Sequence, residues 1–243
     1  MAEASSIASS HRPLHWTWLG RRPYAATFEL QEAIRLQVKA AEGPERLLLL
    51  EHDPVFTLGR NARGKDVVAD RGWLHRHGVE VHESNRGGQV TYHGPGQLVG
   101  YPIVDLNPDR RDIGHYVRDL QEVLIRSLAD HGIEARRRDG KEHIGVWVGD
   151  GKIASIGVHL SRWVTLHGFA LNVAPDLEHF SGIVACGLPD VTMTSIERQG
   201  VAVPELPDLA ATVARRFAEV FDRRDLVAAP PSTVDQVAVP EVC

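Results

Sequence analysis

Two residues of the chain, Cys186 and Lys152, together indicate a chemistry that neither indicates alone. Cys186 stands in Ser181-Gly-Ile-Val-Ala-Cys-Gly-Leu-Pro189, a run of small residues that can present a thiol to a pocket. Taken alone, an isolated cysteine is more often a small buried hydrophobe. Lys152 precedes the apolar and small residues Ile153-Ala-Ser-Ile-Gly157, so its amine could lie at a pocket edge, although an exposed hairpin lysine fits the same spacing. A partly desolvated amine can take a proton from a thiol and so generate the nucleophilic thiolate.

The second notable feature is a glycine-rich stretch, Arg86-Gly-Gly-Gln-Val-Thr-Tyr-His-Gly-Pro-Gly-Gln97, between the strand-like runs 79–83 and 98–104. Glycine is entropically costly in a folded chain, so four glycines in twelve residues indicate sharp turns or a close approach of backbone to another group. A bulge or hairpin that serves only the sheet is the alternative. The neighbouring Arg, Tyr and His favour the wall of a site.

These residues need a scaffold, and the hydrophobic pattern predicts one of mixed type. Apolar residues from Ile113 to Leu128 recur at steps of three and four, which predicts a helix over 112–131 that Asp112 caps and Gly132 ends. Gly149-Asp-Gly151 predicts a hairpin turn. Further helices are expected at 23–41, 71–77 and 208–221, and further strands at 15–19, 47–50, 144–148, 152–159 and 163–173. Helices mixed with antiparallel hairpins favour an α+β fold over a doubly wound sheet.

Length and composition limit the class of protein. The 243 residues suffice for one large domain, and 43% of them are hydrophobic. The net charge of −5 argues against nucleic acid as the main partner. Two cysteines, Cys186 and Cys243, exclude a disulfide framework and fit a reducing cytosol. No signal peptide or apolar run of membrane-spanning length is evident, so we expect a cytoplasmic protein. We expect a flexible N-terminus at 1–12, a catalytic domain at 13–227 and a disordered tail at 228–243.

Several common functional motifs are missing from the sequence. No phosphate-binding Gly-x-x-x-x-Gly-Lys-[Ser/Thr] or dinucleotide-binding Gly-x-Gly-x-x-Gly follows a strand. The thirteen histidines are scattered, and pairs such as His75 and His77 lack supporting ligands at known metal spacings. We therefore expect neither a metal nor a cofactor.

Four motifs together resemble the octanoyltransferase family of lipoate biosynthesis, also called lipoyl(octanoyl) transferase or lipoate-protein ligase B. They are Arg86–Gln97, Gly151-Lys-Ile-Ala-Ser-Ile-Gly157, His167-Gly-Phe-Ala-Leu-Asn172, and Cys186-Gly-Leu followed by Thr194-Ser195. They occur in that family's order, and the resemblance covers about residues 14–222. It implies a biotin/lipoate protein ligase-like catalytic domain, with a mixed, mainly antiparallel sheet flanked by helices.

The resemblance also implies the reaction. The family moves an octanoyl group from octanoyl-acyl carrier protein to a lysine of lipoyl domains, in 2-oxoacid dehydrogenase E2 subunits and the glycine-cleavage H protein. Cys186 is then the nucleophile that forms an acyl-thioester, and Lys152 activates its thiol and relays the proton. Tyr92, His93 and His167 are expected as positioning groups at the mouth of the acyl slot rather than as bases. The acyl chain is expected to lie against Arg86, Gly87, Gly88, Gln89, Val90, Thr91, Tyr92, His93, Ser155, Ile156, Gly157, Gly168, Phe169 and Ala170.

Two other functions remain open at this stage. An ATP-dependent lipoate or biotin ligase would share the implied fold, but its glycine-rich segment typically continues His-Asp where this chain has His93-Gly-Pro-Gly-Gln97. A non-catalytic protein that binds acyl groups or lipoyl domains would not need Cys186. We expect the transferase to act as a monomer, with no nucleic acid or membrane among its partners.

Overall fold

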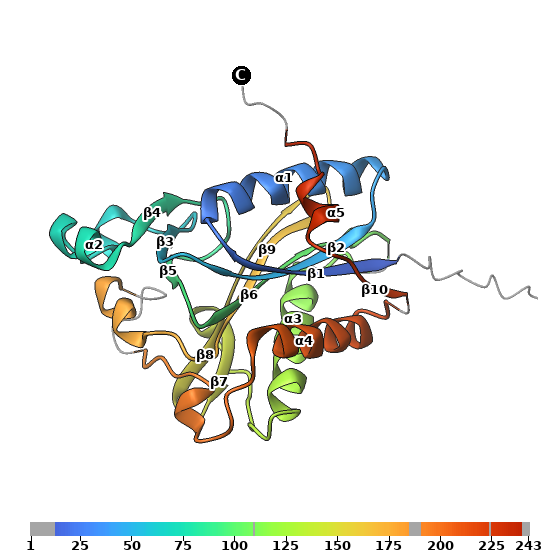
Figure 1. Cartoon of the computed structure of the whole chain (residues 1–243). Helices are drawn as coiled ribbons and strands as arrows, with labels where there is room; N and C mark the ends of the chain where they lie inside the picture. Colours follow the sequence, from blue (N-terminus) through green and yellow to red (C-terminus); the bar gives the residue numbers. More distant parts are fainter. Residues whose placement is uncertain (1–12, 109, 185–190, 224, 240–243) are drawn as a thin grey trace, which may run out of the picture.

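The larger of two sheets has seven strands in the order β10-β1-β2-β6-β9-β8-β7 (Figure 1). The structure, a computed structural model, describes residues 13–108, 110–184, 191–223 and 225–239. The two neighbours of β1 run parallel to it, whereas the pairs from β2 to β7 are antiparallel. The strands are β1 Leu14–Arg22, β2 Glu45–His52, β6 Gln97–Ile103, β7 Gly145–Val148, β8 Gly151–Ser161, β9 Val164–Asn172 and β10 Leu226–Ala228. The predicted α+β class is confirmed.

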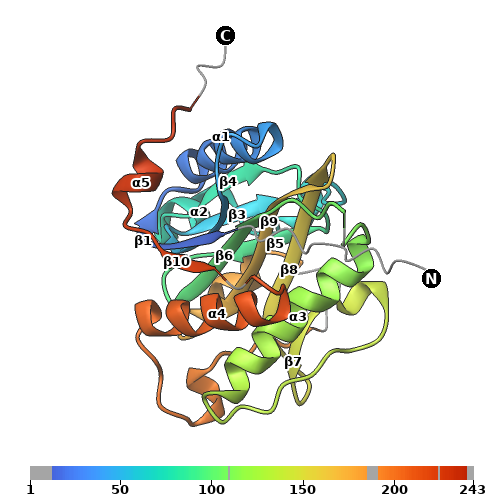
Figure 2. The same cartoon turned by 90° about the vertical axis from the view of Figure 1, so that its right-hand side faces the viewer.

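Helices cover both faces of this sheet. Helix α1 (Tyr24–Ala40) lies on one face, and α3 (Ile113–Ala129) and α4 (Leu206–Val220) pack together on the other (Figures 1 and 2). As predicted, the Asp112 side chain accepts a hydrogen bond from the His115 backbone N–H and begins α3. Within the described residues, no helix is long and apolar enough to cross a membrane.

A smaller sheet forms beside the main one. It has the order β4-β3-β5, from Glu80–Glu83, Val55–Leu58 and Val90–His93. Helix α2 (Arg71–His77) ends where predicted, because Gly78 adopts the left-handed conformation with φ 61°. Short 3-10 helices occupy Gly64–Asp66, Lys141–His143, Leu177–Gly182 and Glu197–Gln199.

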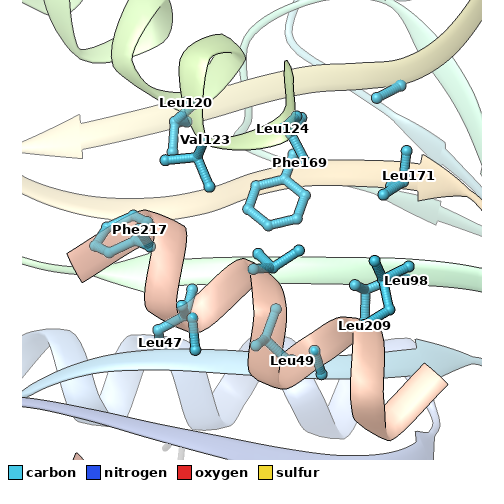
Figure 3. Close-up of a cluster of buried hydrophobic side chains, with 14 of the residues drawn as sticks. Leu47, Leu49, Leu98, Leu120, Val123, Leu124, Phe169, Leu171, Leu209 and Phe217 are labelled. Atoms are coloured by element: carbon cyan, nitrogen blue, oxygen red, sulfur yellow. The ribbon is translucent and has the colours of Figure 1, made fainter. Parts of the chain in front are cut away.

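The largest hydrophobic cluster lies between the sheet and α3, and it includes Phe169 of β9. Figure 3 shows the Phe169 ring between Leu124 of α3 and the leucines of β2. On β6, a Cβ at Gly100 would lie 2.1 Å from this ring, so only glycine leaves room for it. Close packing fixes the position of β9 against β6 and of every residue that β9 contributes to the site.

The chain after residue 227 differs from the expected disordered tail. Strand β10 pairs with β1, and α5 (Ser232–Asp235) packs on the core (Figure 2). Val234 is fully buried beside residues of α1 and β2. The alanine, proline and valine content of this segment predicted disorder. Two valines spaced three apart, Val234 and Val237, are instead buried in the core.

Candidate functional site

A cavity of about 580 Å³ lies beside the part of β8 that does not pair with β7. Strand β7 pairs with β8 only from Gly151 to Ser155. Beyond that point the glycine-rich segment takes over, and the Gly87 N–H donates to the Val158 carbonyl over 2.9 Å. A Cβ at Gly157 would lie 3.0 Å from the Gly87 carbonyl oxygen, so the approach leaves little room for a larger residue on β8. Glycine therefore lets a loop dock on an open sheet edge.

The glycine-rich segment is held from behind by the chain after β3. The backbone N–H groups of Arg60 and Asn61 donate to the carbonyls of Arg86 and Gly88. Gly88 has φ 86°, a conformation that other residues rarely adopt. The Arg86 guanidinium is buried and donates to the Thr57 hydroxyl and carbonyl and to the Gly87 carbonyl. These bonds fix one wall of the cavity.

Lys152 lies in the same cavity wall and is 2% exposed. Its Nζ lies 5.7 Å from the centre of the Trp147 ring. Its backbone joins the segment that follows residue 190, since the Lys152 N–H donates to the Thr192 carbonyl and the Thr194 N–H to the Lys152 carbonyl. A nearly buried amine so placed is a candidate for proton transfer.

Three buried histidines lie in or next to the cavity, and burial is the main reason that each is neutral. His93 and His167 line it, and His52 bonds to the lining residue Tyr101. Burial lowers the pKa of His52 to about 4. Burial, with a contribution from Arg86, lowers the pKa of His167 to about 3. Burial, His52 and Arg86 hold the pKa of His93 well below its ordinary value. These side chains act at neutral pH as hydrogen-bonding groups, not as cations.

Hydrogen bonds fix the tautomers of these rings. His52 donates from Nδ1 to the Arg22 carbonyl and accepts at Nε2 from the Tyr101 hydroxyl, over 2.8 and 2.7 Å. Burial keeps that hydroxyl protonated, because it raises the pKa of Tyr101 well above 10. His167 donates from Nε2 to Asn85 Oδ1 over 2.6 Å, and its ring stacks on Phe28.

A buried chain of hydrogen bonds, made by two side-chain amides, connects His93 with the strand of Lys152. Gln97 donates from Nε2 to the Tyr92 carbonyl and to Asn172 Oδ1, so its Oε1 accepts from Nδ1 of His93. Asn172 then donates to the Thr194 carbonyl over 2.9 Å. Because the Thr194 N–H donates to the Lys152 carbonyl, hydrogen bonds connect two lining residues of the cavity, His93 and Lys152.

Comparison with known proteins identifies the family. The model of the lipoyl protein ligase A/B catalytic domain matches residues 23–218. An octanoyltransferase of Solibacter usitatus is 50% identical over 204 residues, which are 84% of this chain and 91% of the relative. One of Geobacter metallireducens is 45% identical over 207 residues, covering 85% and 92%. The chain belongs to the octanoyltransferase family. It is therefore an enzyme, a transferase of octanoyl groups in protein lipoylation.

Solved structures share the octanoyltransferase fold with low sequence identity. Lipoate-protein ligase A bound with ATP superposes with a TM-score of 0.75 at 16% identity, covering 91% of this chain and 92% of the ligase. A bi-partite lipoate protein ligase from Thermoplasma acidophilum gives 0.71 at 18% identity, covering 92% and 91%. These likenesses establish the fold, and they confirm the predicted ligase-like catalytic domain.

The octanoyltransferase cavity brings together most of the predicted site residues. They are Lys152, Arg86, Gly87, Gly88, Gln89, Val90, Thr91, His93, Ser155, Ile156, Gly157, Gly168, Phe169 and Ala170, with His167. Tyr92 is an exception, since its ring packs on Phe56 and Phe180 instead. His93 and His167 are buried and line the cavity. Cys186 lies outside the described residues.

Some residues of the site escaped the sequence analysis. Tyr24 and Tyr101 line the cavity, and His52 bonds to Tyr101 and stacks edge-on against Tyr24. Tyr24 lies in α1, Tyr101 in β6 and His52 in β2. The apolar neighbours of these residues predicted buried helices and strands but no site. A polar residue at the end of a strand that is buried along most of its length, as at His52 in β2, was the available signal.

Proposed function

We propose that the enzyme transfers the octanoyl group from octanoyl-acyl carrier protein, through a thioester on Cys186, to the target lysine of lipoyl domains. The acceptors would be E2 subunits of 2-oxoacid dehydrogenases and the glycine-cleavage H protein. The observation that carries this proposal is the buried amine of Lys152, set in the wall of a largely apolar cavity and bonded through its backbone to the segment just after Cys186.

The anchors on either side of Cys186 support its proposed role. Before it, the Val184 N–H donates to the Asp66 carbonyl over 2.8 Å. After it, Thr192 bonds to the backbone of Lys152 itself over 2.8 Å. Cys186 therefore belongs to a short segment that is anchored at Val184 and at Thr192. The second anchor is a hydrogen bond to Lys152, the proposed base.

The first step loads the enzyme. Lys152 takes the proton of the Cys186 thiol, and the thiolate attacks the carbonyl carbon of the donor thioester. The new bond from Sγ to carbon forms as the bond to the carrier sulfur breaks. The Lys152 ammonium can stabilise the developing oxyanion and return its proton to the departing carrier thiolate. Exchange of one thioester for another is close to isoenergetic, so this step needs no nucleotide.

The second step unloads the enzyme onto the acceptor. The neutral amine of the target lysine attacks the acyl carbonyl, an amide bond forms, and the Cys186 thiolate leaves. The nitrogen loses a proton, and the thiolate or Lys152 can take it up. Formation of an amide from a thioester is downhill, which drives the overall transfer without ATP.

The cavity is suited to a saturated chain. Val90, Ile156 and Phe169 contribute apolar surface, and Gly87 and Gly157 add no side chains. Burying the roughly six methylenes of an octanoyl chain at about 0.8 kcal/mol each would supply roughly 5 kcal/mol. A volume of about 580 Å³ lies within the usual range for small-molecule sites.

An ATP-dependent ligase is the main rival, because proteins of this fold include one bound with ATP. It would activate a free acid as an acyl-adenylate and use no cysteine. The high identity to octanoyltransferases and the position of Lys152 favour the thioester route. A binding protein without catalysis is the remaining rival, and it would not depend on Cys186.

One assay separates the three. The protein is incubated with octanoyl-acyl carrier protein in the absence of ATP, and its intact mass is recorded. We expect a single hydroxylamine-labile octanoyl adduct that is absent in Cys186→Ser. An adduct that persists in this variant removes Cys186 from the mechanism. Modification of a lipoyl domain by free octanoate, strictly dependent on ATP, would identify a ligase instead.

A further inference from the structure

The side chain of Lys152 occupies space that a single glycine leaves open. A Cβ at Gly145, the first residue of β7, would lie 2.4 Å from the Ala154 carbonyl oxygen of β8, 2.5 Å from Lys152 Cε and 3.3 Å from Nζ. Gly145 also has φ 148°, which residues with a side chain rarely adopt. Any larger residue at this position would strain the backbone and displace the amine.

Gly145 is itself held by a helix on the face of the sheet. Gln121 of α3 is buried and donates from Nε2 to the Gly145 carbonyl over 2.8 Å. The adjoining pairing between β7 and β8 is irregular, with a register shift between Val146 and Trp147. The hydrogen bond from Gln121 of α3 therefore fixes the start of β7, next to the irregular part of the strand pairing.

Trp147 completes the surroundings of the amine. Its ring lies 5.7 Å from Nζ of Lys152, and its indole N–H donates to the His143 carbonyl. Its backbone bonds in both directions to Arg136. Arg138 lies over the same ring at 4.3 Å, and Asp150 pairs with this guanidinium.

We propose that Gly145 and Gln121 are positioning residues for Lys152. They hold its amine at the depth and angle from which it activates Cys186, and Trp147 supports it from the side. This inference rests on the proposed function, since it assigns these residues to the proton transfer between Lys152 and Cys186. Neither residue contacts the substrate in this role.

The test measures the thiol directly, without an acyl donor. In a Cys243→Ser background, the rate of alkylation of Cys186 by iodoacetamide is followed by intact mass from pH 5 to 10. Gly145→Ala and Gln121→Leu are compared with Lys152→Ala. Gly149→Ala controls for a positive-φ glycine, since nothing lies within 4 Å of its added Cβ. Ser127→Ala controls for a lost buried hydrogen bond on α3.

We expect Lys152→Ala to move the alkylation profile to higher pH. Gly145→Ala and Gln121→Leu should move it in the same direction and slow alkylation at pH 7 by roughly 3- to 10-fold, corresponding to a shift of about 0.5 to 1 pH unit. Both controls should follow the parent protein. If Gly145→Ala does not fold, Gln121→Leu decides the question.

Two different failures remain distinguishable. If Lys152→Ala shifts the profile and folded Gln121→Leu does not, the positioning inference is overturned and the proposed function stands. If Lys152→Ala itself follows the parent profile, the proton-relay part of the proposed function fails, and the inference fails with it. A shift of equal size in Gly149→Ala or Ser127→Ala also overturns the inference.

Discussion

At the scale of single residues, the buried histidines couple the site to the stability of the fold. The folded-state pKa of His52 is about 4, below its ordinary value of 6.5, so the unfolded chain binds more protons between these values. Stability is therefore fully present above pH 6.5 and falls as pH drops towards 4, by about 3 kcal/mol for His52 alone. His167 extends the loss to about pH 3.

This linkage predicts the behaviour of His52→Gln. The variant should be less stable than the parent at pH 7, by about 1 to 3 kcal/mol, because the Tyr101 hydroxyl and the Arg22 carbonyl lose well-placed partners. Its stability should fall less between pH 7 and pH 4.5, since one titrating group is gone. Urea unfolding at several pH values measures both effects, with His75→Gln at an exposed site as control. Parallel pH curves for parent and His52→Gln would contradict the assignment.

Tyr92 allows a second test at this scale. Its ring packs on Phe56 and Phe180, outside the cavity, and burial followed by Asp176 raises its pKa to about 12. Tyr92→Phe should therefore keep the Michaelis constant for the acyl donor within about twofold, whereas Tyr92→Ala should lose about 3 to 5 kcal/mol of stability. A large rise in the Michaelis constant for a stably folded Tyr92→Phe would return this residue to the binding site.

At the scale of elements, local signals were sufficient where one face is apolar or a cap is present. The sequence predicted α2 over 71–77, and α3 with its cap at Asp112, within a few residues. It did not predict β3 as a strand, because four residues between a proline and a glycine give too short a pattern. The small sheet was missed with it. The close approach of Gly145 and Lys152 lies beside a register shift between β7 and β8, and no spacing in the sequence reveals such a shift.

Helix α5 yields a prediction about the element that the sequence analysis took for a disordered tail. Val234 is fully buried against residues of α1 and β2. Val234→Ala removes two methyl-sized groups and should destabilise the fold by about 2 kcal/mol at about 0.8 per group. Val239→Ala, at a side chain 42% exposed, is the matched control and should have little effect. Equal unfolding midpoints for both variants would show that α5 does not contribute to the core.

At the scale of the whole molecule, a short basic segment adjoins the cavity. The chain carries a net charge of −5, yet Arg60 lines the cavity and the exposed residues Arg63 and Lys65 follow it. The adjoining backbone is bonded to the segment before Cys186, because the Val184 N–H donates to the Asp66 carbonyl. We expect this basic segment, bonded to the chain at Val184, to favour an acidic carrier protein, since opposite charges accelerate encounter.

Charge reversal of Arg63→Glu with Lys65→Glu should therefore raise the Michaelis constant for octanoyl-acyl carrier protein by roughly 3- to 10-fold at low salt, with little change in turnover. The effect should shrink in about 1 M salt, where the screening length falls to about 3 Å. A small neutral octanoyl thioester should react equally well with both proteins, because it lacks the carrier's charge. Lys39→Glu is the control, about 22 Å along α1 from the cavity residue Tyr24. An equal loss with both donors would mean that the double variant damages the site itself, and the carrier would then have to dock on another surface.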